Sequence, residues 1–211
     1  MWRRVRIVSG LLLAALSVAG VTYLVAIHPY VQPCFDSLAG NAGAHLPVLP
    51  RLAVASSADP GFYSQSPIRS RLTYQLARQS CQTRTSNLRR GVIELALGIR
   101  ITLRYSHDEI VELYANHLYF GDANGQEVFG IDSASRIFAH VEPQRLSVAD
   151  SAMLAALSSA PRYLQNRPEK LLERRNAVID RMAGAGAITR VEADNAKTQP
   201  LRLRRPHALA N

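Results

Sequence analysis

The N-terminus places the strongest constraint on this chain, because a basic tip precedes a long apolar run. Arg3, Arg4 and Arg6 are followed by the segment from Ile7 to Ile27, which contains no charged residue. About 20 apolar residues in a helix span the hydrocarbon core of a bilayer, and flanking arginines stay on the cytoplasmic side. We therefore predict a membrane-spanning helix over residues 7–27, with residues 1–6 as a cytoplasmic basic tip.

A cleaved signal peptide is the alternative interpretation of the same segment. Ser17-Val18-Ala19 offers the small residues that a signal peptidase needs. Both interpretations export the remainder of the chain, and the sequence leaves the choice between them open.

Two cysteines, Cys34 and Cys81, lie on the exported side of the predicted helix. In an oxidising compartment they could pair and close a loop of about 47 residues. Two separate thiols, one buried and one near the membrane, are the alternative, and the sequence does not decide between them.

The rest of the chain divides into an irregular segment, a folded domain and a tail. Residues 28–57 are expected to be a linker, since prolines recur between Tyr30 and Pro60 without a sustained period. Residues 58–198 are expected to form the domain, and residues 199–211 a basic tail.

Helical periodicity dominates the expected domain from Ser70 onward, and alternating strand patterns are absent. Gly121 to Gly130 is expected to be a glycine-containing loop. Three capping boxes predict helix starts, at Ser106 with Glu109, Ser147 with Asp150, and Thr189 with Glu192. The expected fold class is mainly α.

The net charge of +9 comes almost entirely from arginine, which suits phosphates, carboxylates and anionic lipid headgroups. We expect no nucleic-acid partner, because the chain lacks both a Cys/His zinc spacing and an RNA-binding aromatic signature.

Four ordered stretches between Ser70 and Thr189 carry the chemistry. The first two stretches are Ser70 to Arg78 (Ser-Arg-Leu-Thr-Tyr-Gln-Leu-Ala-Arg) and Arg90 to Glu94 (Arg-Gly-Val-Ile-Glu). The third runs from Tyr105 to Ala134 and includes Tyr119-Phe120-Gly121 and Gly130-Ile131-Asp132-Ser133-Ala134. The fourth runs from Leu146 to Asn176 and includes Ala160-Pro161 and Arg174-Arg175-Asn176. Together these stretches resemble glycosyltransferase family 51, the peptidoglycan transglycosylase domain of penicillin-binding proteins and of monofunctional transglycosylases.

The resemblance implies a lysozyme-like helical transglycosylase domain that polymerises lipid II, an undecaprenyl-pyrophosphate-linked disaccharide-peptide. A carboxylate must take a proton from the attacking sugar hydroxyl, and cationic groups must hold the departing pyrophosphate. It also implies a divalent cation such as Mg²⁺ at the pyrophosphate, other cell-wall synthases as partners, and a place on the outer face of the bacterial inner membrane. We expect no metal site built by the protein alone.

The same resemblance indicates which residues are candidates for the site. Glu94 and Asp59 are the candidate catalytic carboxylates, and the candidate substrate-binding residues are Thr73, Gln75, Arg78, Arg89 and Arg90. A helix-surface pair is the alternative for Arg90 and Glu94, which lie one turn apart.

Ala58 stands where the family has its base glutamate, so two functions stay open. One is a peptidoglycan glycosyltransferase in which Asp59 substitutes for that glutamate. The other is a catalytically impaired relative that binds lipid II or glycan and acts as a scaffold or regulator of a synthase.

Overall fold

The computed structural model describes residues 26–40, 43, 45–81 and 87–203. The predicted anchor over residues 7–27 lies outside these residues, apart from its last two positions. Within the described part of the chain, no helix is both long and apolar enough to cross a membrane.

Helices make up most of the described chain, so the mainly α class is confirmed. Residues 26–40 are helical. The further helices are α2 (Val48–Ala58), α3 (Arg71–Ser80), α4 (Asn87–Arg104), α5 (His107–His117), α6 (Ile131–Ala134), α7 (Val148–Leu157), α8 (Pro161–Leu164), α9 (Pro168–Gly184) and α10 (Arg190–Thr198). Short helical turns cover Phe62–Ser64, Pro67–Arg69, Ser135–Ala139 and Pro143–Arg145, and two strands, β1 (Tyr119–Ala123) and β2 (Gln126–Phe129), complete the fold.

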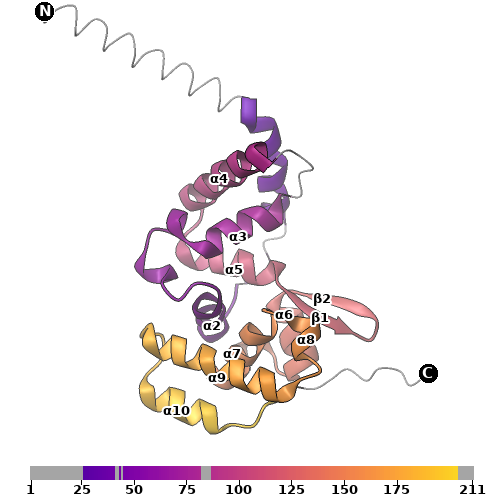
Figure 1. Cartoon of the computed structure of the whole chain (residues 1–211), viewed down its shortest axis with the longest axis vertical. Helices are drawn as coiled ribbons and strands as arrows, with labels where there is room; N and C mark the ends of the chain where they lie inside the picture. Colours follow the sequence, from indigo (N-terminus) through magenta and orange to yellow (C-terminus); the bar gives the residue numbers. More distant parts are fainter. Residues whose placement is uncertain (1–25, 41–42, 44, 82–86, 204–211) are drawn as a thin grey trace, which may run out of the picture.

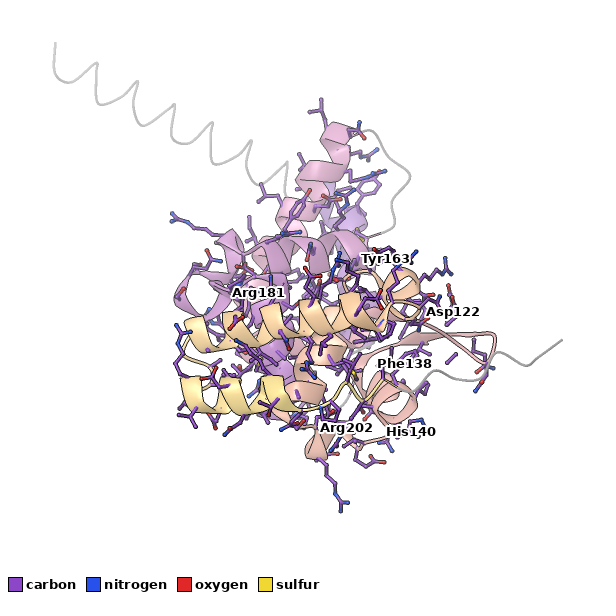
Figure 2. All side chains as sticks on the ribbon, turned by 60° about the horizontal axis from the view of Figure 1, so that its bottom comes forward. Asp122, Phe138, His140, Tyr163, Arg181 and Arg202 are labelled. Atoms are coloured by element: carbon purple, nitrogen blue, oxygen red, sulfur yellow. A yellow bond between two sulfur atoms is a disulfide. The ribbon has the colours of Figure 1, made fainter. Side chains whose placement is uncertain are left out.

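The centre of one half of the molecule is α7, which is buried from Ala149 to Leu157. Helices α2 and α9 pack against it, and α10 lies beside α9 (Figures 1 and 2). Phe138, fully buried, comes from the π-helical turn before α7 (Figure 2). Helices α3, α4 and α5 form the other half, toward residues 26–40 (Figure 1). An almost wholly apolar helix such as α7 is stable only when other elements cover it on every side.

The irregular segment expected between Tyr30 and Pro60 is instead largely helical. Residues 26–40 and α2 both contribute buried side chains, such as Leu38 and Ala53, which are 0% exposed. The prolines misled the prediction, because Pro47 is the N-cap of α2 and Pro50 lies in its first turn. Backbone N–H groups in a first turn have no helical partner, so proline costs little there.

All three capping boxes are confirmed. In each, the Ser or Thr side chain accepts from the backbone N–H three residues later, and the acidic side chain accepts from the cap's N–H in return. They begin α5, α7 and α10, so these three helix starts are determined by local sequence.

The glycine-containing loop expected from Gly121 to Gly130 is a two-stranded antiparallel hairpin, so that prediction was wrong. Asn124 and Gly125 form its turn with φ of 52° and 77°. Asn-Gly favours this turn because both residues tolerate positive φ. Glycine is also favoured at Gly121, since its φ of 113° lies in a region that residues with a side chain rarely adopt.

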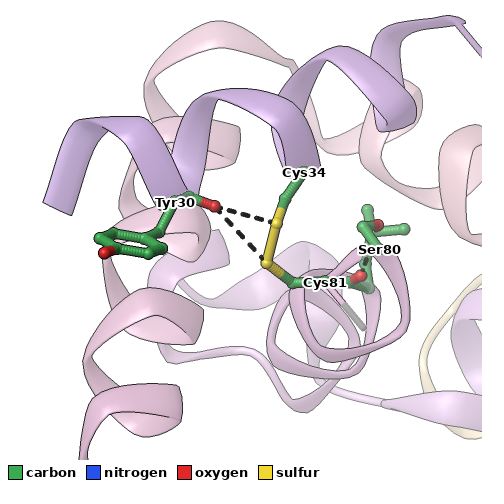
Figure 3. Close-up of a disulfide and its surroundings, with 5 residues drawn as sticks. Tyr30, Cys34, Ser80 and Cys81 are labelled. Carbon is green, nitrogen blue, oxygen red and sulfur yellow. Dashed lines mark hydrogen bonds between the residues drawn. A yellow bond between two sulfur atoms is a disulfide. The ribbon is translucent and has the colours of Figure 1, made fainter. Parts of the chain in front are cut away.

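Cys34 and Cys81 form a disulfide with a Cα–Cα distance of 5.0 Å (Figure 3). The bridge joins the helix of residues 26–40 to the residue that follows α3. The question that the sequence left open is therefore answered in favour of pairing.

A partly buried ionic cluster links α2 to α5. Nη1 of Arg51 donates to Oε1 of Glu112 at 3.0 Å, and Nη2 lies 3.2 Å from Oδ2 of Asp108. The Tyr63 hydroxyl donates to Asp108 at 2.9 Å, and its burial together with the Asp108 charge raises the pKa of Tyr63. Glu112 thus has a structural role in joining the two halves of the fold.

Candidate functional site

A cleft of about 1370 Å³ lies between α3 and the segment that runs from the end of α5 through the hairpin to α6. Most of its lining residues are polar or aromatic: Arg71, Tyr74, Gln75, Arg78, Gln79, Asn116, His117, Tyr119, Phe129, Asp132 and Ser133, with Gly43 and Gly130. Two arginines, three side-chain amides and three aromatic rings give this surface the means to bind both anionic and sugar groups.

A second hollow of about 330 Å³ adjoins the cleft. The two share Arg71, Gln75, Gln79 and Tyr119 in their linings. Ala58 lines the second hollow, so the position expected to carry a base glutamate does face the site. A methyl group occupies that position, and it can neither accept nor donate a proton.

The amphipathic pattern of α3 explains why its polar side chains face the cleft. Leu72, Leu76 and Ala77 are fully buried on one side of the helix, which leaves Gln75 and Arg78 on the other. The Ser70 hydroxyl caps the helix by accepting from the backbone N–H of Leu72. One wall of the cleft is therefore set by a short, well-capped helix.

Glu94 projects from α4 toward α3 and is only 3% exposed. Interaction with the Glu94 carboxylate raises the pKa of the Tyr74 hydroxyl, while nearby Arg78 acts in the opposite direction. One oxygen of the Glu94 carboxylate, Oε1, is buried without a hydrogen-bond partner. Glu94 thus lies behind the cleft wall, close to Tyr74, which lines the cleft.

Asp59 has a different environment from Ala58, although the two are adjacent. Its carboxylate accepts from the Ser70 hydroxyl at 2.7 Å, the Arg71 backbone N–H at 3.0 Å and Nε2 of Gln65 at 3.1 Å. These bonds fix the loop between α2 and α3. Asp59 is not among the residues that line the cleft or the second hollow; it lines a separate pocket beside the end of α9.

The five candidate substrate-binding residues are not brought together. Gln75 and Arg78 line the cleft, and the Tyr114 hydroxyl donates to Oε1 of Gln75 at 3.1 Å. Thr73 is 1% exposed and faces the interior. The Arg89 guanidinium lies 4.0 Å from the centre of the Tyr30 ring. Arg90 is half-buried on α4 and is also absent from the cleft lining.

Sequence reasoning missed the opposite wall of the cleft. Phe129 is 51% exposed, and its ring centre lies 5.3 Å from that of Tyr119. Asp132 is the only acid among the described lining residues, and Arg136 pairs with it at 3.3 Å. The Asn124-Gly125 pair was the signal that could have revealed this wall, because it predicts a hairpin and hence exposed strand residues.

Two carboxylates lie near this site, since Asp132 lines the cleft and Glu94 lies behind its wall. Among the described residues, no group of three His, Cys, Asp or Glu side chains could hold a metal ion. Glu94 offers a single free carboxylate oxygen, and Mg²⁺ often binds one or two carboxylates and completes its shell with phosphate and water. Cation dependence therefore stays a prediction, in which substrate phosphates supply most of the ligands.

Comparisons with known proteins agree with the resemblance. The family model for transglycosylase matches residues 62–183, a range that begins after Ala58 and Asp59. Penicillin-binding protein 1A of Aquifex aeolicus is 33% identical over 138 residues, covering 64% of this chain and 18% of that protein. A putative transglycosylase of Cupriavidus necator is 35% identical over 137 residues, covering 64% of this chain and 58% of that protein.

The chain thus spans only part of the length of these curated relatives. Among solved structures, penicillin-binding protein 1A from Haemophilus influenzae matches with a TM-score of 0.41 at 21% identity, covering 63% of this chain and 17% of that one.

Proposed function

Since this chain belongs to the transglycosylase family, we propose that it binds lipid II or nascent glycan during peptidoglycan assembly and has little or no polymerising activity of its own. The cleft between α3 and the hairpin is the binding site. In this role the protein presents glycan to a cell-wall synthase, or regulates one.

The position of Ala58 is the observation that carries the proposal. It lines the site where the resemblance implies a base glutamate. Asp59, the nearest carboxylate in sequence, already accepts hydrogen bonds from Ser70, Arg71 and Gln65. A carboxylate held in this way would have to give up bonds that fix its loop before it could take a substrate proton.

Binding is supported by the chemistry that the cleft retains. Arg71 and Arg78 supply positive charge for a pyrophosphate, and Gln75, Gln79 and Asn116 supply amide groups for sugar hydroxyls. Loss of a base does not remove these groups, so affinity for the ligand can outlast catalysis.

We place the domain on the outer face of the inner membrane, held there by the predicted helix over residues 7–27. The disulfide between Cys34 and Cys81 supports an exported location, because such bonds persist in oxidising compartments.

The decisive experiment measures binding and polymerisation with the same purified full-length protein and labelled lipid II. We expect saturable binding without glycan product. Glycan strands formed at a rate comparable with an active family member would overturn the proposal, and so would a failure to bind lipid II.

One observation favours the alternative of an active enzyme, namely the unpaired Oε1 of buried Glu94. In that case Glu94 would act on the pyrophosphate side, through a cation or a proton. Glu94→Gln distinguishes the two, because product that disappears in this variant assigns the activity to this protein and not to a contaminating synthase.

A further inference from the structure

The second hollow beside Ala58 is lined by one cationic side chain and, among the described residues, by no acidic one. Its lining consists of Val54, Ser57, Ala58, Arg71, Gln75, Gln79, Tyr114, Leu118, Tyr119, Ser158 and Ser159. Of these side chains only Arg71 is charged at neutral pH. Asp59, the carboxylate next to Ala58 in sequence, lines a different pocket. The electrostatic balance of the hollow therefore favours an anionic occupant.

The Arg71 guanidinium is available to such an anion. No acidic side chain in the described part of the chain forms an ion pair with it. Burial raises the pKa of the Tyr114 hydroxyl, while the charge of Arg71 acts to lower it, so this charge lies close to a hydroxyl that lines the hollow. A guanidinium presents a planar fork of N–H donors that matches the two oxygens of a carboxylate.

Two side-chain amides continue the row of donors that begins at Arg71. Gln75 and Gln79 follow Arg71 at intervals of four residues along α3, which places all three on one face of the helix. The Tyr114 hydroxyl donates to Oε1 of Gln75 at 3.1 Å, so Nε2 is the atom of this amide that can donate to a ligand. One helix face thus offers a guanidinium and two amides to the same hollow.

The hollow also has room for the group that Ala58 lacks. Glutamate differs from alanine by one methylene and one carboxylate, which together are the heavy atoms of an acetate ion. The hollow measures about 330 Å³, several times the ~30 Å³ that a water molecule occupies in the liquid. Because it shares Arg71 and Gln75 with the cleft, an ion bound there lies beside whatever the cleft holds.

We propose that the second hollow binds a small carboxylate ion, such as formate or acetate, and that this ion supplies the proton acceptor missing at Ala58. The inference rests on the proposed function, because it takes lipid II to be the ligand of the adjoining cleft. The protein is then inactive alone and becomes active when the ion is bound.

The proton transfer and the bond changes balance as follows. An oxygen of the bound ion takes the proton of the acceptor's sugar hydroxyl, and the hydroxyl oxygen forms the new bond to the anomeric carbon of the donor. The bond between that carbon and the pyrophosphate oxygen breaks, and the pyrophosphate leaves with the electron pair. The ion departs as the neutral acid and gives its proton to water.

Binding of the ion is tested first, with the full-length protein and isotope-labelled formate in the absence of lipid II. The line width of the formate NMR signal reports the bound fraction. Ala58→Gln fills the hollow with an uncharged side chain as long as that of glutamate, and Arg71→Ala removes the cation without changing position 58. Both variants should weaken formate binding by about threefold or more.

Arg181→Ala is the control for formate bound to exposed arginines, since Arg181 lines neither hollow nor cleft. This variant should broaden the formate signal as much as the parent does. Equal broadening in the parent and in the Ala58→Gln protein would overturn the anion site.

The role of the ion as a base is tested by lipid II polymerisation in formate, acetate or chloride at the same ionic strength. We expect product from the parent to rise and saturate with formate or acetate, to about tenfold or more above the rate in chloride. Ala58→Glu carries its own base, so carboxylate should change its rate by less than about twofold. Ala58→Gln should form no product in any of the three salts.

Lipid II binding is measured in the same samples, which separates this inference from the proposed function. Saturable lipid II binding without carboxylate-dependent product would overturn the role of the ion as a base and leave the proposed function standing. Equal product in chloride and in formate would show that another group is the base, and would also overturn the inference. Absence of lipid II binding would overturn the proposed function together with the catalytic step, while the formate signal still decides the anion site.

Discussion

The hydroxyl of Ser70 donates to Oδ2 of Asp59 at 2.7 Å, and the same hydroxyl accepts from the backbone N–H of Leu72. One serine therefore caps α3 and holds the carboxylate next to Ala58. Two adjacent residues therefore have different roles: Ala58 lines the second hollow of the site, whereas Asp59 stabilises the loop between α2 and α3.

Ala58→Glu should introduce polymerisation if the missing base is the main defect. A positioned general base contributes about 10²–10⁴-fold, so a gain of tenfold or more over the parent is expected in a lipid II polymerisation assay. Asp59→Glu is the control, because its carboxylate stays on the loop side and should give no gain. An Ala58→Glu protein that binds lipid II but stays inactive would show that further parts of the site are lost.

Arg78→Ala should weaken lipid II binding by about tenfold, because a charge-assisted contact to pyrophosphate is lost. The affinity of the variant should also depend less on salt than that of the parent. Arg181→Ala removes the same charge from an exposed position on α9 (Figure 2) that lines neither the cleft nor the second hollow, and it should leave binding unchanged. Isothermal titration at two salt concentrations measures both effects, and equal losses in the two variants would contradict a pyrophosphate site at Arg78.

Phe129→Ala should reduce affinity for glycan strands by about fivefold while leaving inorganic pyrophosphate binding intact. The exposed ring beside Tyr119 offers an apolar surface for a sugar ring, and stacking of this kind contributes about 1 kcal/mol. Tyr163→Ala, on α8 and 45% exposed, removes an aromatic ring that is not part of the cleft lining. A loss of pyrophosphate binding in Phe129→Ala would indicate a collapsed cleft instead of a lost sugar contact.

Glu112→Gln should lower the free energy of unfolding by about 3 kcal/mol, because the partly buried Arg51 guanidinium then loses the negative charge of Glu112. Glu173→Gln breaks the exposed Lys170–Glu173 pair and should cost less than about 1 kcal/mol. Urea denaturation followed by circular dichroism gives both values. Similar small costs for the two variants would mean that water screens the Arg51 cluster.

The cap of α5 should make stability depend on pH. Hydrogen bonds from Ser106 lower the pKa of Glu109 below its usual value of 4.5. A depressed carboxyl pKa stabilises the folded state above about pH 4.5, and this contribution is lost as the pH falls through the folded-state pKa. Ser106→Ala should therefore cost about 1 kcal/mol at neutral pH and less near pH 3. Melting temperatures of parent and variant across this range test the prediction, and a pH-independent difference would contradict it.

Local sequence predicted the parts of this fold that local interactions determine. Ser106, Ser147 and Thr189 each satisfy an N–H group three residues away, so their helix starts could be read directly. The hairpin was missed because glycine was read as a loop signal, although Asn124-Gly125 is a turn signal with its own geometry.

The candidate site was less predictable, because its walls come from distant parts of the chain. Gln75 and Phe129 line one cleft, yet no local pattern relates them. Thr73 lies within the same predicted stretch as Gln75 but faces the interior, since a helix turns successive side chains in different directions. Periodicity could have assigned Thr73 to the buried side together with Leu72 and Leu76.

The disulfide gives the two walls of the cleft different covalent topologies. Residues 34–81 form a closed ring that contains Ala58, Asp59 and all of α3, whereas the hairpin wall belongs to open chain. A ring of this size restricts the unfolded chain by about 4 kcal/mol, a stabilisation that applies to the folded domain as a whole. A protease cut between α2 and α3 would therefore release no fragment until a reductant opened the ring, while a cut in the hairpin would divide the protein through the other wall of its own binding site.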